Sequence, residues 1–172
     1  MFYRISNPIF KKDYLLILKI LKDYSDKIAI VYYPSVENKN DMEIRTALMN
    51  FYLETDWMKK WPRTINSKKA RVDFYAYNHS SYTLLKKSRS LININQEQTI
   101  DVFFLLNNRC VFYSVIHEDI YVVTDPKLAE AFRIAGYPLL KIPASSSKFF
   151  WDIENRENVY NNILLSLKKS IQ

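Results

Sequence analysis

The positive charge of this chain is concentrated in one segment, residues 57–91, where cationic side chains alternate with aromatic ones. Nine residues of the segment are Lys or Arg and only Asp73 is acidic, a net charge of +8, whereas the whole chain carries +7. Ammonium and guanidinium groups neutralise phosphates, and exposed rings stack on bases. The segment therefore predicts a surface that binds nucleic acid or another polyanion. Its members are Lys59, Lys60, Arg63, Lys68, Lys69, Arg71, Tyr75, Tyr77, Lys86, Lys87 and Arg89.

A structural interpretation of the same segment is that Trp57 and Trp61 belong to the core and the lysines form a solvated rim. Coding bias toward AT-rich codons would explain why the chain has 17 Lys but 8 Arg. Such bias does not explain why the lysines cluster. The clustering favours the binding interpretation.

The two histidines, His79 and His117, are the weak candidates for catalysis. A metal-independent ribonuclease would need an acid, a base and a cation such as Lys86 or Lys87 to stabilise the phosphorane. However, His117 lies in an expected turn and His79 lies among serines in an irregular stretch. Structural roles for both histidines fit these contexts better.

Acidic residues do not form a pattern typical of a metal site. Glu37 and Asp125 each precede a lysine by two residues, but Glu37 lies in a polar loop and Asp125 is expected to cap a helix. Glu54 and Asp56 would point about 200° apart on the helix that we expect there. We therefore expect no metal ligand set in the chain.

Nucleophile and cofactor motifs are also missing from the sequence. Ser80 and Ser81 adjoin His79 in the chain, without a glycine elbow. A single glycine, Gly136, excludes the glycine-rich loops of Rossmann and Walker nucleotide sites, so no nucleotide or other cofactor is expected. Cys110 lies in an apolar run, where a buried, unreactive thiol in a reducing, cytoplasmic compartment is expected.

The first half of the chain predicts two helices and two strands. Asn7 and Pro8 favour a helix start, and apolar spacing predicts a helix over 8–24. The run 28–33 predicts a buried strand, and the apolar stripe after Asn40 predicts a helix over 41–60 that Pro62 ends. In residues 72–77, period-two alternation predicts a strand with Tyr75 and Tyr77 on a solvated face. A short helix is expected at 81–88.

The second half predicts an antiparallel meander followed by helices. Three strands over 100–124 are separated by turns at 107–108 and 117–119. Asp125 and Pro126 favour a helix start. Gly136 is expected to end this helix, because glycine readily adopts the left-handed backbone conformation. A strand is expected at 139–142. The spacing of Val159, Ile163 and Leu167 predicts a C-terminal helix.

Together these elements predict one α+β domain over residues 1–172. We expect a mixed sheet of about five to six strands, including the 100–124 meander, covered by about four helices. A length of 172 residues and 48% hydrophobic residues fit one folded domain. No segment resembles a signal peptide or a membrane span, which predicts a cytoplasmic protein without a membrane partner.

Three functions are compatible with these patterns. The first is non-enzymatic binding of nucleic acid through residues 57–91. The alternative is a protein-binding inhibitor, such as an immunity protein, an antitoxin or an anti-defence factor of a bacterial or phage mobile element. It would dock aromatic side chains, which make up 15% of the chain, on an acidic protein surface. The third is a small nuclease that uses His79 or His117.

Overall fold

One antiparallel sheet of eight strands and four α-helices make up the α+β domain in the residues that the structure describes. The computed structural model describes residues 2–6, 13–32, 39–62, 64–87, 100–115, 118 and 120–142. The elements in chain order are β1 (Phe2–Ile5), α1 (Tyr14–Lys22), β2 (Lys27–Tyr32), α2 (Lys39–Leu48), the 3-10 helix η1 (Met49–Phe51), β3 (Tyr52–Trp61), β4 (Thr64–Ala76), α3 (His79–Lys87), β5 (Ile100–Leu106), β6 (Arg109–Val115), β7 (Ile120–Val123), α4 (Pro126–Ile134) and β8 (Leu139–Ile142).

The strands lie in the order β3-β4-β2-β5-β6-β7-β1-β8, and every neighbouring pair is antiparallel. The expectation of a mixed sheet of five to six strands was therefore wrong. Two strands escaped the sequence patterns: β1 is only four residues long, and β3 falls in a stretch with helical spacing. The meander β5-β6-β7 is confirmed. Its first turn places Asn107 at φ 50° and Asn108 at φ 62°, the left-handed pair that a tight hairpin needs.

The expected helix over 41–60 is wrong in its second half. Helix α2 ends at Leu48, and residues 52–61 form strand β3 along β4. Phe51, Tyr52 and Met58 fit a helical stripe, but the stretch is also rich in aromatic residues, which suit a strand. Pairing with the long strand β4 decides between the two. The strand expected at 72–77 is correspondingly longer and begins at Thr64.

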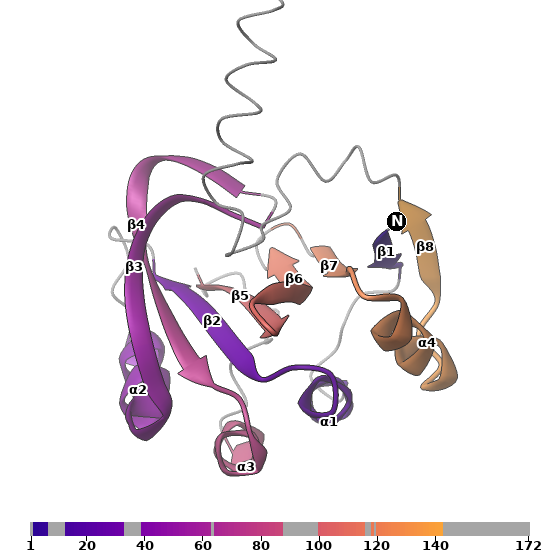
Figure 1. Ribbon diagram of the computed structural model, residues 1–172, viewed down its shortest axis with the longest axis horizontal. Coiled ribbons are helices and arrows are strands. Elements are labelled where there is room, and N and C mark those ends of the chain that lie inside the picture. The colour runs from indigo at the N-terminus through magenta and orange to yellow at the C-terminus, as the bar shows by residue number, and fades with distance from the viewer. Residues whose placement is uncertain are drawn as a thin grey trace, which may run out of the picture.

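All four helices pack on one face of the sheet (Figure 1). Helix α1 contributes Ile17, Leu18 and Leu21 to this core, and Phe132 of α4 stacks on Phe112 of β6. A second apolar cluster covers the opposite face of the sheet and consists of strand residues such as Phe74 and Phe103 in the described part of the chain. The central strands are therefore buried on both faces.

The end of the β3–β4 hairpin bends back over that second face. Asp56 of β3 lies in register, through β4 and β2, with Asp101 of β5. Trp61 is five residues farther along β3, yet its Nε1 donates to Oδ2 of Asp101 at 2.9 Å. The hairpin must therefore curl over the sheet, as its ribbons do in Figure 1. This curl buries Trp61 in the second cluster.

The expected ends of α4 are confirmed. Oδ1 of Asp125 accepts a hydrogen bond from the Leu128 N–H at 2.8 Å, and Pro126 is the first helical residue. Gly136 follows the helix at φ 89°. Helix α1 begins at Tyr14, and residues 8–12 of the helix expected over 8–24 lie outside the described residues, as does the expected cap Asn7. The expected C-terminal helix also lies outside them.

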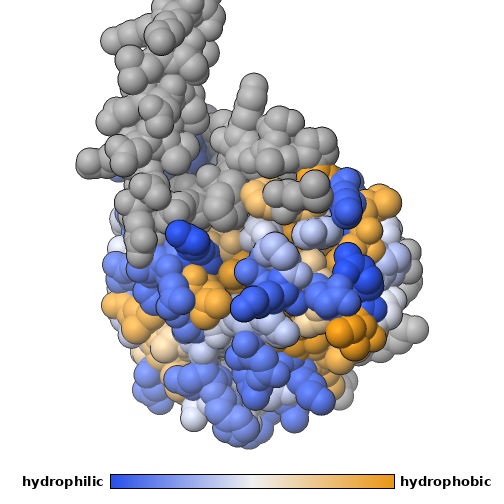
Figure 2. All heavy atoms as spheres, turned by 45° about the vertical axis from the view of Figure 1, so that its right-hand side comes forward, coloured by the Kyte–Doolittle hydropathy of each residue, from blue (hydrophilic) through white to orange (hydrophobic). Residues whose placement is uncertain are grey.

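Figure 2 brings the α4 and β8 side of the molecule forward. In the coloured part of this view, hydrophilic side chains cover much of the surface, and hydrophobic areas lie between them. The exposed apolar residues of α4 and β8 include Ile134 and Leu140. Among the described helices, none combines the length and apolar character needed to cross a membrane.

Candidate nucleic-acid interface

The fold divides the basic segment between two ends of the sheet. Lys59 and Lys60 lie on β3 and Lys68 and Lys69 on β4, all exposed on the curled hairpin. Helix α3, which carries the exposed Lys86 and Lys87, lies at the opposite end of β4 (Figure 1). The hairpin lysines are thus brought together, and the α3 lysines lie apart from them. Arg63 and Arg89 lie outside the described residues.

Tyr75 and Tyr77 were expected on a solvated face, and this expectation was wrong. Their exposed fractions are 1% and 3%, because the helices cover the face of β4 that carries them. The Tyr77 hydroxyl donates to the carbonyl oxygen of Leu18 at 2.9 Å. Burial raises the pKa of both phenols above their ordinary value. Neither ring is accessible for stacking on a base.

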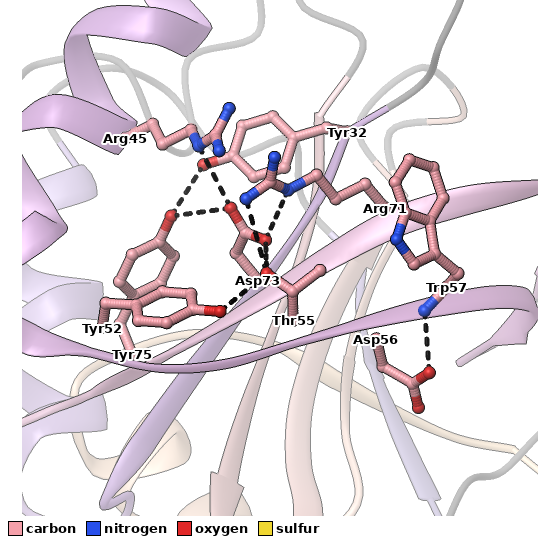
Figure 3. Close-up of polar contacts among 9 residues, drawn as sticks. All are labelled: Tyr32, Arg45, Tyr52, Thr55, Asp56, Trp57, Arg71, Asp73 and Tyr75. Carbon is pink, nitrogen blue, oxygen red and sulfur yellow. Dashed lines mark hydrogen bonds and ion pairs between the residues drawn. The ribbon is translucent and has the colours of Figure 1, made fainter.

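A buried carboxylate organises the polar residues beneath α2 (Figure 3). The Asp73 side chain is 1% exposed, and its Oδ1 accepts from Nε of Arg71 at 2.7 Å and from Oγ1 of Thr55 at 2.5 Å. Its Oδ2 lies 3.3 Å from Nε of Arg45 and accepts from the Tyr75 hydroxyl at 3.3 Å. We call these five residues the Asp73 cluster. Both carboxylate oxygens are therefore satisfied by donors from α2, β3 and β4.

Further hydroxyls extend this cluster. The Tyr32 and Tyr75 hydroxyls are 3.3 Å apart, and the Tyr52 hydroxyl donates to Oγ1 of Thr55 at 3.0 Å. The same Thr55 oxygen accepts from Nη2 of Arg71 at 3.4 Å. Arg71 is thus held by two acceptors, which fix the plane of its guanidinium.

The electrostatic balance of the cluster is positive. Burial lowers the pKa of Arg71, but the hydrogen bond and negative charge of Asp73 outweigh this effect and raise the pKa overall. Two guanidiniums face one carboxylate, which leaves one excess positive charge. The side chains of Arg45 and Arg71 are 29% and 28% exposed. Each guanidinium is therefore held from the inside by Asp73 and keeps part of its surface open to solvent.

Trp57 lies beside Arg71 at this surface. The two residues are cross-strand partners of β3 and β4, so their side chains share one face of the sheet (Figure 3). Trp57 is 53% exposed. The two tryptophans of the hairpin thus have opposite roles, since Trp61 is buried. Trp57, the two arginines held by Asp73 and the hairpin lysines form what we call the Arg71–Trp57 surface. Its members are Arg45, Trp57, Lys59, Lys60, Lys68, Lys69 and Arg71.

The other candidate residues have structural roles or stay apart. His79 is exposed at the start of α3, with its ring 6.4 Å from that of Tyr82, and His117 lies outside the described residues. Ser81 is buried and its Oγ accepts from the Asn78 N–H at 2.8 Å. Cys110 is buried, and burial raises the pKa of its thiol. Ser81 and Cys110, which the sequence offered as possible nucleophiles, thus have structural roles.

The acidic residues also differ from their expected placement. Glu54 and Asp56 lie at alternate positions of strand β3, so they point to one face instead of about 200° apart. No group of three His, Cys, Asp or Glu residues that could hold a metal ion occurs within the described ranges. Glu37 lies outside these ranges.

Sequence reasoning missed two members of the site, Arg45 and Thr55. The alternation of Arg71 and Asp73 along one strand does place them on one face, which is a usable signal for their ion pair. Nothing in the spacing indicates that Arg45, 28 positions before Asp73, would reach the same carboxylate. Thr55 was assigned to a helix.

Comparisons of the chain with protein-family models, with curated proteins and with solved structures find no match.

Proposed function

We propose that this protein binds nucleic acid through the Arg71–Trp57 surface. The observation that carries the proposal is the pair of guanidiniums that Asp73 orients beside the half-exposed Trp57. Guanidiniums donate two parallel hydrogen bonds to a phosphate, and a donor that is already oriented loses less entropy on binding. The four lysines of the hairpin lie beyond Trp57 and Arg71, toward the end of the hairpin, and add charge that attracts the backbone.

Stacking on Trp57 gives the surface a second kind of contact. Base–aromatic stacking contributes about 1–3 kcal/mol per base and tolerates any sequence. The Trp57 ring is next to Arg71, so one nucleotide can place its base on the ring while its phosphate meets the guanidinium. Binding of this kind needs no catalytic residue.

A second candidate function is docking on a partner protein, as an inhibitor or antitoxin would do. Met49, Tyr52 and Leu53 are exposed, largely apolar side chains that lie close together in the chain, at η1 and the start of β3. Large exposed apolar side chains are typical anchors of protein interfaces. The basic hairpin beside them would suit an acidic partner surface.

Titration of the protein with single- and double-stranded DNA and RNA across a salt series tests the proposal. Trp57 is exposed, so its fluorescence reports contact with the ligand; Trp57→Phe identifies its share of the signal. We expect binding whose logarithm falls linearly with the logarithm of the salt concentration. The absence of any binding at low salt would reject nucleic-acid binding and leave protein docking as the function to pursue.

A matched pair of variants locates the binding surface. Lys68→Glu with Lys69→Glu reverses two exposed charges on the hairpin, and Lys86→Glu with Lys87→Glu does the same on α3. We expect the first variant to reduce the salt slope by about 2 and to weaken binding strongly. The α3 variant should bind nearly as the unmodified protein does. Equal losses in both variants would contradict a surface confined to the hairpin.

A further inference from the structure

The side chains of Trp57 and Arg71 offer two different kinds of contact on one face of the β3–β4 hairpin. The two residues are cross-strand partners, so their β-carbons lie roughly 5 Å apart. Trp57 is 53% exposed, and the Arg71 side chain keeps 28% of its surface open. A flat ring and a guanidinium are thus available to one ligand at neighbouring positions.

Arg71 is held along the surface of the hairpin. Its Nε donates to Oδ1 of Asp73 at 2.7 Å, and its Nη2 donates to Oγ1 of Thr55 at 3.4 Å. The guanidinium therefore points away from the Trp57 ring, toward Asp73 (Figure 3). A guanidinium has more N–H donors than these two bonds use, so the others remain for a phosphate. An arginine that reads base edges in a duplex has to extend into the major groove, which these two bonds oppose.

The hairpin beneath the ring is fixed to the sheet on its inner face. Met58 and Trp61 are both buried in the second apolar cluster. Nε1 of Trp61 donates to Oδ2 of Asp101 at 2.9 Å. Because the side chain of Met58 points into the cluster, that of its neighbour Trp57 points to the other face of the strand. The ring thus lies on the outer face of an anchored hairpin, whose backbone is in place before a ligand arrives.

One nucleotide can use both contacts only when its base is unpaired. In a duplex each base is stacked between its neighbours and shows only its edges in the grooves, so its face does not reach a protein ring. In a single strand the base can stack on an aromatic side chain while the backbone follows a positively charged surface. Trp57 therefore contributes stacking to the binding of a single strand and none to the binding of a duplex.

The positive charge of the surface does not by itself favour a single strand. A duplex has the higher charge density, and the logarithm of its affinity falls with the logarithm of salt by about 0.9 per phosphate contact, against about 0.7 for a single strand. Phosphate contacts alone therefore favour the duplex at low salt. A preference for single strands has to come from stacking on Trp57, and it should widen as salt weakens the phosphate contacts.

We propose that the ligand of the Arg71–Trp57 surface is single-stranded nucleic acid, bound with an unpaired base on Trp57 and a phosphate at Arg71. The preference rests on the proposed function and adds the form of nucleic acid that the surface selects. Neither contact reads the edge of a base or the sugar. The surface therefore accepts single strands of DNA and of RNA with little dependence on sequence.

Fluorescence anisotropy of a labelled oligothymidine of about 16 nucleotides tests the preference, with its duplex with oligodeoxyadenosine as the second probe. We expect the single strand to bind about tenfold tighter or more, and the ratio to rise with salt concentration. Trp57→Tyr keeps a ring and should keep the preference. Trp57→Leu should lose it, because its affinity for the single strand falls while that for the duplex does not. Oligouridine shows which of RNA and DNA binds tighter.

A preference that Trp57→Tyr retains and Trp57→Leu abolishes supports the proposal. Equal or tighter binding of the duplex overturns it, as does a preference that falls with rising salt or that Trp57→Leu leaves unchanged. In these cases nucleic-acid binding through the hairpin still stands. The absence of binding to both probes overturns the proposed function as well. Far-ultraviolet circular dichroism controls for folding, and the salt series of the unmodified protein needs no variant.

Discussion

Nε of Arg71 lies 2.7 Å from Oδ1 of Asp73, two residues along the same face of β4, and this contact links a guanidinium that is partly open to solvent with a carboxylate that is buried. Asp73 contributes no accessible charge of its own. Its role is to hold Arg71 and Arg45 in place. The binding surface therefore depends on a residue that a ligand does not reach.

Asp73→Asn separates the orientation of the arginines from their charge. The substitution adds one positive charge to the protein, which by itself would strengthen polyanion binding. We expect weaker binding, because the two guanidiniums lose their common acceptor. Fluorescence titration at fixed salt measures the effect. Tighter binding by Asp73→Asn would show that charge alone drives association.

The same substitution should also lower the free energy of unfolding. Breaking a fully buried ion pair costs roughly 3–5 kcal/mol, and because both arginines can regain some water here we expect about 2 kcal/mol. Urea denaturation followed by circular dichroism gives the value. Asp56→Asn, which changes a less buried carboxylate on β3, is the control and should cost less.

Alkaline pH should destabilise the protein through its buried tyrosines. Burial raises the pKa of Tyr75 and Tyr77 in the folded state, so above pH about 10 the unfolded chain ionises at these positions while the folded protein stays neutral. The stability is complete below pH about 10 and falls as the pH rises. Tyr77→Phe should make this fall less steep. Equal slopes in the variant and the unmodified protein would contradict the prediction.

Cys110 should resist thiol reagents until the protein unfolds. Its side chain is buried, and burial raises the pKa of the thiol, so little thiolate is present at neutral pH. We expect reaction with Ellman's reagent to follow the urea unfolding curve. Rapid modification of the native protein at pH 8 would show that the β6 strand opens locally.

Replacing Gly136 by a residue with a β-carbon should lower the stability of the protein through backbone conformation alone. At φ 89° it ends α4, and a Cβ built there would meet no atom within 4 Å. Gly136→Ala should therefore cost about 1 kcal/mol through backbone strain without any clash. Gly136→Asn should cost less, because asparagine tolerates the left-handed region better. A thermal unfolding series separates the three proteins.

Elements with local signals were predictable from the sequence. The turn at Asn107 and Asn108, the cap at Asp125 and the glycine at 136 each rely on residues that suit one backbone conformation, and the structure confirms all three. The strand β2 and the helix α3 were found within one or two residues of their expected bounds.

Elements that depend on distant partners were not predictable in the same way. Strand β3 carries a helical stripe, and only its long partner β4 makes it a strand. Tyr75 alternates correctly with Phe74, but alternation cannot show that helices cover the second face as well. Arg45 reaches Asp73 only because α2 packs across β4, which no spacing in the sequence encodes.

The position of β1 determines when the sheet can be completed during synthesis. Phe2 pairs with Ile142 and Tyr3 with Val123, so β1 lies between two strands that follow it by more than a hundred residues. Because pairing of residues this distant in sequence is slow, the N-terminal strand must wait, unpaired, while the rest of the sheet assembles. Nascent chains halted before β7 should therefore leave β1 open to proteases, and chains in which β7 and β8 have both left the ribosome should protect it.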